Sequence, residues 1–312
     1  MPARQQPFPF IYKRFSAFLF STVPVLGMTV YLYGLRPVIM VVISVMMALL
    51  SDVLVSMMTK RKYDGRDLSS IMFAVIYVLL LPASIRYGIV IGGICFTLLV
   101  KHAFGGYGGC IFHPSAFGFA ASAICWPAEL FRYPAPFSYS GMDLKSGVVL
   151  FNSPAFTIRN GAVPVTIDRV DLLLGNHPGP LGASFCIVFI AILVFLIACK
   201  VTSWHIPFIY LLTAAAFSFA FPRLEIGRAE SVLYELCSDI LVFAAVYIAA
   251  DPVTSPVNPK AKLIYGFLLG IVTMIFNYYG VFQFGVLFAV LLVNPLSPYL
   301  DRKYPSKGGG AR

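Results

Sequence analysis

Charged residues are scarce in this chain. Asp, Glu, Lys and Arg make up 12% of its 312 residues, whereas 59% of the residues are hydrophobic and the mean hydropathy is +0.84. A soluble domain has about a quarter charged residues. The composition therefore excludes an ordinary soluble domain. It predicts an all-α integral membrane protein, long enough for about ten transmembrane helices of ~20 residues each.

The sequence also lacks the common motifs of soluble catalysis. It contains no Walker phosphate loop, no HExxH and no GxSxG, and its six cysteines form neither a CxxC pair nor the spacing of an iron–sulfur site. No segment is large enough to form a soluble domain that oxidises NADH by itself. Most cysteines lie in apolar runs and are interpreted as small buried hydrophobic residues. Cys110 is different, because it lies in a Gly-rich turn.

The net charge of +10 does not indicate nucleic-acid binding, because the basic residues lie in short runs that flank apolar segments. With a cytoplasmic N-terminus, fifteen of the 23 Lys and Arg residues fall in inside segments and eight in outside segments. This bias predicts that both termini are cytoplasmic. No cleavable signal peptide is expected, because the N-terminal segment is polar and no small-residue cleavage site follows the first apolar run.

Ten apolar runs define the expected spans. These runs cover residues 16–34, 36–58, 68–82, 86–102, 113–131, 183–200, 204–221, 232–250, 261–278 and 281–299. They divide the chain into a first five-helix half (1–131), an outer-face loop (132–182), a second five-helix half (183–300) and a cytoplasmic tail (301–312). The end of the loop, "DLLLGNHPGPLGAS" (171–184), is rich in Gly and Pro and predicts a rigid turn at a pocket rim or docking surface.

The two halves repeat weakly. The segment "DLSSIMFAVIYVLLLPAS" (67–84) is similar to "LCSDILVFAAVYIAADPVTS" (236–255), and each precedes a span that begins near a Tyr-Gly pair. Because each half has five spans, an odd number, the halves are expected to be inverted. Inverted repeats place binding sites and broken helices at their interface.

The densest motif is "KHAFGGYGGCIFHPSAFG" (101–118). Its glycines allow close backbone approach, either to a neighbouring helix or to a planar ligand, and the residues do not decide between these uses. Pro114 favours the start of a helix. His113 has no partner His or carboxylate at helical spacing, so a structural or interfacial role is favoured over metal ligation.

Several acidic residues lie in or beside apolar runs, where unpaired carboxylates are costly and indicate an ion path or a buried salt bridge. Asp251 ends a span before three prolines and is either functional or the cap of an Asx turn with Val253 or Thr254. Asp239 lies four residues after Glu235, on one predicted helix face. Asp52 lies inside the second run and either belongs to an ion path or reaches the headgroups near residues 60–62.

Taken together in their order, these segments resemble the D subunits of Rnf electron-transport complexes, which are related to the B subunits of sodium-translocating NADH:quinone oxidoreductases. The segments are "DLSSIMFAVIYVLLLP", "KHAFGGYGGCIFHPSAFG", "DLLLGNHPGPLG", "TSWHIPFIYLLTAAA", "AADPVTSPVNPKAKLIYGFLLG" and "YGVFQFGVLFAVLLVNPLSPYLDR". The resemblance covers residues 67 to 302. It implies ten transmembrane helices in two inverted halves of five, in agreement with the interpretation from the residues.

The resemblance also implies a flavin. Family members carry FMN bound through a phosphoester to the Thr of an outer-loop S-G-A-T motif. Here the matching segment is "NGAVP" (160–164), in which Gly161 and Ala162 fit but Asn160 replaces Ser and Val163 replaces the acceptor Thr. Val163 has no hydroxyl, so either FMN or riboflavin binds without a covalent tether or the loop has another use. Thr157 and Thr166 are the nearest hydroxyls. Cys110 and His113 are further departures, because Asn is expected at both places.

Cofactor contacts are expected in two segments, the outer loop and the Gly-rich turn. Arg159 lies beside the variant motif and can meet a phosphate, whereas Tyr107, Phe112 and Phe156 can stack on a ring. The candidate cofactor residues are Arg159, Gly161, Ala162, Val163, Gly105, Gly106, Tyr107, Gly108 and His113. The candidate ion pathway consists of Asp251, Asp239 and Asp52.

The predicted function is that of a redox subunit in the bacterial cytoplasmic membrane, part of an Rnf-like translocase rather than an enzyme acting alone. Electrons enter from cytoplasmic partner subunits and leave to a flavinylated protein on the outer face, and Na⁺ or H⁺ movement can accompany them. Two alternatives stay open. One is an inverted-repeat transporter or channel, and the other is a scaffold without cofactor.

Overall fold

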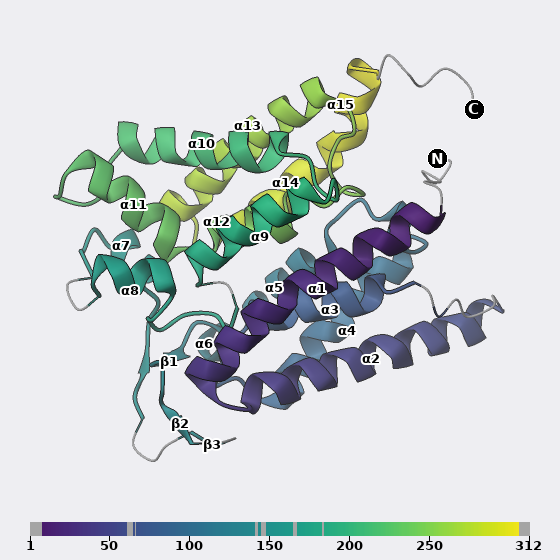
Figure 1. Cartoon of the computed structure of the whole chain (residues 1–312), viewed down its shortest axis with the longest axis horizontal. Helices are drawn as coiled ribbons and strands as arrows, with labels where there is room; N and C mark the ends of the chain where they lie inside the picture. Colours follow the sequence, from purple (N-terminus) through teal and green to yellow (C-terminus); the bar gives the residue numbers. More distant parts are fainter. Residues whose placement is uncertain are drawn as a thin grey trace.

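The chain is described here by a computed structural model, which covers residues 8–60, 65, 67–140, 143–144, 148–164, 167–182 and 184–305. Helices dominate it. Figure 1 shows that α1 begins and α15 ends at the same end of the molecule, on the right, whereas α7, α8, α11 and the short strands gather at the opposite end. We call the end with the strands the outer end and the other the inner end, following the orientation that the charges predict.

Helices before the outer segment follow the first five predicted spans. They are α1 (Phe8–Tyr33), α2 (Arg36–Thr59), α3 (Ser69–Leu79), α4 (Tyr87–Ala103), a 3₁₀ turn η1 (Tyr107–Gly109), α5 (Pro114–Cys125) and α6 (Pro127–Leu130). The outer segment holds the pairs β1–β4 (Tyr133–Pro134 with Leu150–Phe151) and β2–β3 (Tyr139–Ser140 with Asp143–Leu144), both antiparallel, followed by α7 (Pro154–Arg159) and α8 (Arg169–Leu174).

The second set of helices follows the last five spans. They are α9 (Cys186–Ala198), α10 (His205–Ala220), α11 (Arg228–Ser238), α12 (Leu241–Tyr247), α13 (Pro259–Tyr279), α14 (Gly285–Val293), a 3₁₀ turn η2 (Asn294–Leu296) and α15 (Ser297–Lys303). Three described segments are long and apolar enough to cross a membrane: Phe15–Tyr33, Arg36–Thr59 and Pro259–Tyr279. Five further apolar helices are shorter: α3, α4, α5, α9 and α10.

Two predicted spans are not continuous helices. The run 113–131 is divided at Trp126, because a residue before proline is driven out of the helical region and Pro127 starts a new turn. The run 232–250 is divided at Asp239, whose backbone is extended (φ −101°, ψ 170°) between α11 and α12. Apolar composition predicts that a segment is buried, but it does not report where the backbone leaves the helix.

The neighbours of the helices are repeated in the two sets. α4 packs against α2 and α5, and α13 packs in the same way against α10 and α14. α3 and α12 occupy equivalent, central places. Every residue of α12 is buried, and in α3 all are buried except Ile71. Tyr77 of α3 and Tyr247 of α12, each five residues before a proline, both bond a buried Ser, at 2.8 and 2.9 Å.

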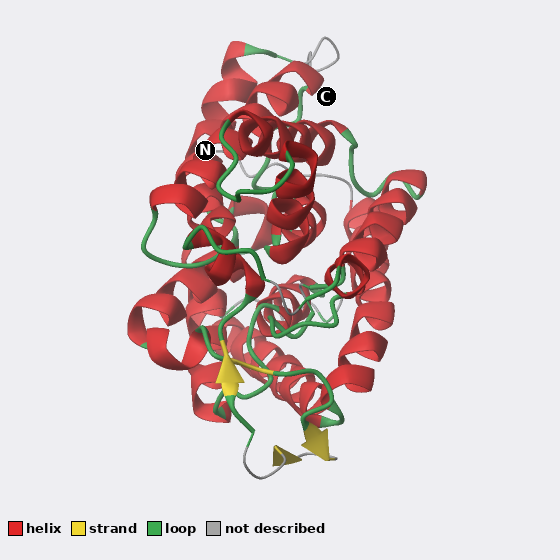
Figure 2. Ribbon diagram, turned by 90° about the vertical axis from the view of Figure 1, so that its left-hand side faces the viewer, coloured by secondary structure: helices red, strands yellow, loops and turns green. Residues whose placement is uncertain are grey.

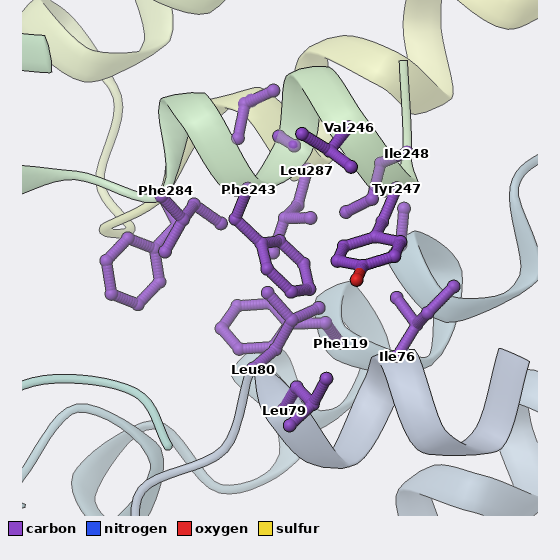
Figure 3. Close-up of a cluster of buried hydrophobic side chains, with 14 of the residues drawn as sticks. Ile76, Leu79, Leu80, Phe119, Phe243, Val246, Tyr247, Ile248, Phe284 and Leu287 are labelled. Carbon is purple, nitrogen blue, oxygen red and sulfur yellow. The ribbon is translucent and has the colours of Figure 1, made fainter. Parts of the chain in front are cut away.

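The two sets meet in one apolar core. Figure 3 shows Leu79 and Leu80 at the end of α3 and Phe119 of α5 facing Phe243 and Tyr247 of α12. The ring of Phe119 lies 6.0 Å from that of Phe284, which precedes α14, and all of these side chains are buried. Burial of this kind contributes about 1.5–3 kcal/mol for each large apolar side chain. The halves are therefore packed as one body.

α3 ends at Leu79, and backbone amides from a later loop bond the carbonyls at and just after its end. The amide of Gly182 donates to the Leu79 carbonyl at 2.9 Å, and the amide of Leu181 donates to the Leu81 carbonyl at 2.8 Å. A Cβ on Gly182 would press on the Leu79 side chain. The predicted rigid turn at 178–182 is thus placed against the end of α3.

Gly93 of α4 gives a test of this packing. A Cβ at Gly93 would overlap the Tyr77 hydroxyl and crowd the Ser122 hydroxyl, two groups that bond each other. We predict that Gly93→Ala lowers the free energy of unfolding by about 1–3 kcal/mol. Gly88→Ala in the same helix is the matched control, since no atom lies within 4 Å of its added Cβ, and it should be neutral or stabilising. Thermal unfolding in detergent measures both. Equal melting temperatures for the two variants would contradict the packing described.

Candidate functional site

The segment 153–164 at the outer end forms a capped helix that the sequence pattern did not reveal. Ser153 is the N-cap of α7, and its hydroxyl accepts from the Phe156 amide and donates to Gln283 Oε1 at 2.7 Å. Pro154 occupies the first helical position, where its missing amide costs nothing. The Ser-Pro pair was the available sequence signal, because Ser followed by Pro is typical of a helix start.

The variant motif 160–164 ends this helix. Gly161 has φ 74° and its amide donates to the Ile158 carbonyl at 2.9 Å, while the Ala162 amide donates to the Thr157 carbonyl at 3.1 Å. This pair of bonds is a Schellman cap, in which glycine takes the left-handed conformation. Val163 is partly buried against the core. The turn therefore has a structural role of its own, and it lies beside the Arg223 carbonyl.

Next to α7 an open pocket of about 340 Å³ lies at the outer end. Figure 2 looks onto this end, where loops run in front of the helices. The aromatic lining comes from Phe131, Phe156 and Phe282, and the rings of Phe131 and Phe282 stack with centroids 6.2 Å apart. The full lining is Pro127, Ala128, Phe131, Arg132, Asn152, Phe156, Val281, Phe282 and Gln283. We call it the outer pocket. Its volume falls in the range of small-molecule sites.

A second, much smaller cavity of about 20 Å³ shares Phe282 and Gln283 with the outer pocket. Its lining is strongly polar, with two guanidinium groups and two carboxylates. The lining residues are Ala155, Ile158, Arg159, Arg223, Glu235, Ser238, Asp239, Asn277, Phe282, Gln283 and Phe284. We call it the small cavity. It has room for about one water molecule.

A buried ion pair forms one wall of the small cavity. Arg223 Nε donates to Glu235 Oε1 at 2.7 Å, and its Nη2 donates to Oε2 at 2.5 Å. The remaining Nη1 donates to the Asn277 carbonyl at 3.0 Å, and the guanidinium lies 3.9 Å from the ring centre of Tyr278. The side chain of Glu235 is 3% exposed. Such a bidentate pair holds α11 against the end of α13.

Asp239 forms the deeper wall of the small cavity. It does not continue the face of α11 as the four-residue spacing predicted, because α11 ends at Ser238, yet it still lines the same cavity as Glu235. Its Oδ1 accepts from the Ile240 amide at 2.7 Å and its Oδ2 accepts from Asn277 Nδ2 at 2.5 Å. Asn277 in turn accepts from the Gly285 amide at 2.8 Å, which joins α12 to the turn before α14.

Arg159 connects α7 to the same turn. Its Nη1 donates to the Val281 carbonyl at 2.8 Å. Partial burial, and then the nearby positive charge of Arg223, lower the pKa of the Arg159 guanidinium from its usual value. A guanidinium beside another cation is stabilised by an anion, so the position of Arg159 in the lining of the small cavity favours an anionic group nearby.

The Gly-rich turn lies elsewhere. Gly105 and Gly106 have φ of 83° and 97°, which accounts for two of its glycines. The Tyr107 hydroxyl donates to Asp251 Oδ1 at 3.3 Å, and the Tyr107 ring lies 4.6 Å from that of Phe15. Phe112 contacts Phe104. The candidate cofactor residues therefore form two groups. The group with Arg159 contacts the turn after α13, and the group with Tyr107 contacts Asp251, which precedes α13.

His113 and Asp251 are both buried in this inner region. The His113 ring packs edge-on against Phe73 at 5.2 Å and is fully buried. Asp251 accepts from the Thr254 amide and hydroxyl, at 3.1 and 3.0 Å. The Asx turn is confirmed, with Thr254 rather than Val253 as the donor. Within the part of the chain that is described, no metal-binding group of side chains is found.

Asp52 is paired. Its Oδ1 accepts from Ser70 at 2.6 Å and lies 3.5 Å from Lys101 Nζ and 3.3 Å from His102 Nε2. Lys101 is 2% exposed and also contacts Asp67. The pairing is within the bundle, while residues 61–62, the other proposed neighbours, lie outside the described residues. Sequence reasoning missed Lys101, although a lone Lys within an apolar run indicates a buried partner.

We predict that Glu235→Gln destabilises the protein by about 3–5 kcal/mol, because it leaves the Arg223 charge buried without its partner. The matched control is Glu230→Gln, since Glu230 belongs to the same helix but pairs with Arg169 at the surface, where both side chains are well exposed. That change should cost about 1 kcal/mol or less. Melting temperatures in detergent compare the two variants, and a smaller loss for Glu235→Gln than for Glu230→Gln would contradict the described geometry.

Comparisons with known proteins place the chain in a family. The model of the NQR2, RnfD, RnfE family matches residues 11–308. The D subunit of the ion-translocating oxidoreductase complex from Actinobacillus succinogenes is 27% identical, over 91% of this chain and 89% of the relative. The protein of the same name from Methanosarcina acetivorans is 26% identical, over 96% and 91%. The D subunit of the Na⁺-translocating ferredoxin:NAD⁺ oxidoreductase complex from Acetobacterium woodii is 26% identical, over 91% and 86%. The chain therefore belongs to the NQR2, RnfD, RnfE family.

Proposed function

We propose that this chain is the D-type membrane subunit of an Rnf-like complex and passes electrons through a flavin at its outer end. The observation that carries the proposal is the outer pocket, where three phenylalanine rings and Arg132 line about 340 Å³ beside the variant motif. The relatives named above are subunits of ion-translocating oxidoreductases, which supports the same role here. Other membrane and cytoplasmic subunits, and a flavinylated protein on the outer face, are the proposed partners.

The proposed topology is ten transmembrane helices in two inverted halves, residues 1–131 and 183–300, joined by the outer loop 132–182. The repeated packing of α4 and α13 and the central, buried α3 and α12 support it. The bias of Lys and Arg supports cytoplasmic termini in a bacterial inner membrane. The tail 301–312 then lies on the cytoplasmic side.

The residues of the outer pocket fit FMN or riboflavin. An isoalloxazine ring needs an apolar slot, which Phe131, Phe156 and Phe282 provide, and the Gln283 side chain adds hydrogen-bonding groups. Arg132 and Arg159 offer positive charge for a phosphate. A bound flavin accepts and donates electrons, and the protein contributes its position and surroundings. The turn residues Gly161, Ala162 and Val163 then support the site through the cap of α7.

A second flavin contact is proposed at the Gly-rich turn, where Gly105, Gly106, Tyr107, Gly108 and His113 lie near Asp251. Left-handed glycines allow close backbone approach, and the buried His113 ring carries hydrogen-bonding groups. An inner and an outer position adjoin the two ends of α13, a helix about 30 Å long. Two positions of this kind support electron transfer along the bundle.

The proposed ion path uses the acids that the helix breaks bury. Asp251 lies at the inner break and Asp239 at the outer break, both nearly without solvent exposure. Asp52, tied to Lys101, lies beside the inner group. Acids at interrupted helices mark ion and proton routes in membrane proteins.

Flavin binding tests the proposal. Purified protein, co-expressed with a flavin transferase, should show a flavin absorption spectrum but no fluorescent band on a denaturing gel, because Val163 offers no hydroxyl. Phe156→Ala should weaken flavin binding about 3- to 10-fold through the loss of one stacking face. Phe151→Ala is the control, an exposed ring of the same outer segment that does not line the pocket. A native spectrum without flavin would overturn the proposal and favour the scaffold, or the transporter if solute flux occurs without an electron donor.

The missing tether gives a second test. Restoring the motif with Asn160→Ser and Val163→Thr should produce a fluorescent band with the transferase present, because the new Thr supplies the phosphoester oxygen. Asn160→Ser alone should stay dark. A band in the unchanged protein would show that another hydroxyl is the acceptor, and Thr157→Ala and Thr166→Ala would then locate it. Thr157 lies in α7, whereas Thr166 is outside the described residues.

A further inference from the structure

The small cavity contains a buried hydroxyl without a partner. Ser238, the last residue of α11, is 5% exposed and lines the cavity, and its Oγ has no hydrogen-bond partner among the described residues. Buried hydroxyls in native proteins are almost always satisfied by protein or by ordered water. A volume of about 20 Å³ beside this hydroxyl is sufficient for one water molecule.

The neighbouring carboxylates are in different situations. Both oxygens of Glu235 are engaged by Arg223, so this carboxylate is already neutralised. Asp239 accepts one bond on each oxygen, from Ile240 and Asn277, which leaves acceptor positions on both. Asp239 is therefore the acid in this cavity with capacity for a further hydrogen bond or a proton.

The charges of the lining favour water over a metal cation. Arg159 and Arg223 both line the cavity, and only Arg223 has a carboxylate bound to it in the described contacts. A sodium ion a few ångströms from two guanidiniums in a poorly solvated site would be repelled. A neutral water carries no such penalty and can bond Ser238 and Asp239 together.

We propose that the small cavity holds one water molecule bonded to Ser238 and Asp239, and that Asp239 passes a proton through it towards the outer pocket. This deepens the proposed function, on which it rests, by assigning a proton carrier to the outer end. Gln283 and Phe282 line both spaces, so the water lies one side chain away from the pocket.

The transfer balances without a further reactant. The O–H bond of the Asp239 carboxylic acid breaks and its proton forms an O–H bond to the cavity water. That water breaks one of its own O–H bonds and gives the proton to a solvent water molecule in the open outer pocket, which becomes hydronium. The carboxylate that remains is held by Ile240 and Asn277, in a cavity whose lining also includes the positive Arg159. A proton returning by the same route restores the acid.

Charged and titratable groups surround Asp239 from several elements. Glu235 lies on α11, Arg223 on the segment before α11, and Arg159 on α7. Tyr210 of α10, Tyr133 of β1 and Cys186 of α9 are also within electrostatic reach of the Asp239 charge. Among these groups Glu235 carries a charge of the same sign as an ionised Asp239, and Arg223 carries the opposite charge.

Infrared difference spectroscopy of the full-length protein in nanodiscs, without flavin or electron donor, tests the proposal. Titration from about pH 4 to about pH 9 should reveal a protonated carboxyl signal that Asp239→Asn removes. Ser238→Ala should shift the signal and slow its deuterium exchange about tenfold by removing the anchor of the water. Glu225→Gln, an exposed acid in the same outer segment as Arg223, should leave it unchanged.

Three results would overturn the inference: no titrating signal that depends on Asp239, no effect of Ser238→Ala, or a shift when choline replaces Na⁺ at constant pH, which would mean a bound cation. If Asp239→Asn fails to fold, Ser238→Ala still decides. Because the titration needs no flavin, a signal in a protein that binds no flavin would count against the proposed function alone. Flavin binding without the signal would count against the proton carrier alone.

Discussion

Every backbone group that a broken helix releases inside a membrane has to find a partner within the protein. This chain breaks helices in its most buried region, and the partners come from distant segments. Leu181 and Gly182 complete the end of α3, and the Asp239 side chain accepts from the first amide at the start of α12. The site at the outer end contains contacts of the same kind. Side chains of Asp239, Asn277 and Arg223 bond backbone groups at the ends of helices there.

These contacts account for the chemistry of the outer end. Asn277 holds the Gly285 amide and Asp239 together, and Arg223 holds Glu235 and the Asn277 carbonyl. Once such groups are fixed, a small space among them is polar and stable in shape, because its walls come from α7, α11, α13 and the segments between helices. An aromatic pocket next to it then has charge and hydrogen-bonding groups within reach, which is the surrounding that a redox cofactor needs.

The apolar runs predicted most helices, the similarity of two segments predicted the weak repeat, and the order of six motifs indicated the family. They failed where the backbone leaves the helix for a local reason. At Asp239 the carboxylate accepts from the Ile240 amide, and Trp126 precedes a proline. They also missed α7, whose start depends on one Ser-Pro pair. Most of the outer pocket could not be predicted from the sequence, because Phe131 and Phe282 are far apart in the chain and resemble ordinary core residues. Phe156 and Arg159 were candidates because they lie beside the variant motif, and Asp239 was a candidate because an acid within an apolar run is costly unless it is paired.

The docking of the 181–182 turn on α3 has a consequence for synthesis. The two amides that complete α3 follow it by about 100 residues, so the first half leaves the ribosome with open carbonyls at its centre. Long-range contacts of this kind close slowly, and exposed intermediates are prone to misassembly. The outer loop is therefore more than a connection, because the end of α3 lacks its hydrogen-bond donors until Leu181 and Gly182 pack against it. A cell that makes this protein has to keep the early helices apart from other partners until the segment with Leu181 and Gly182 has been made.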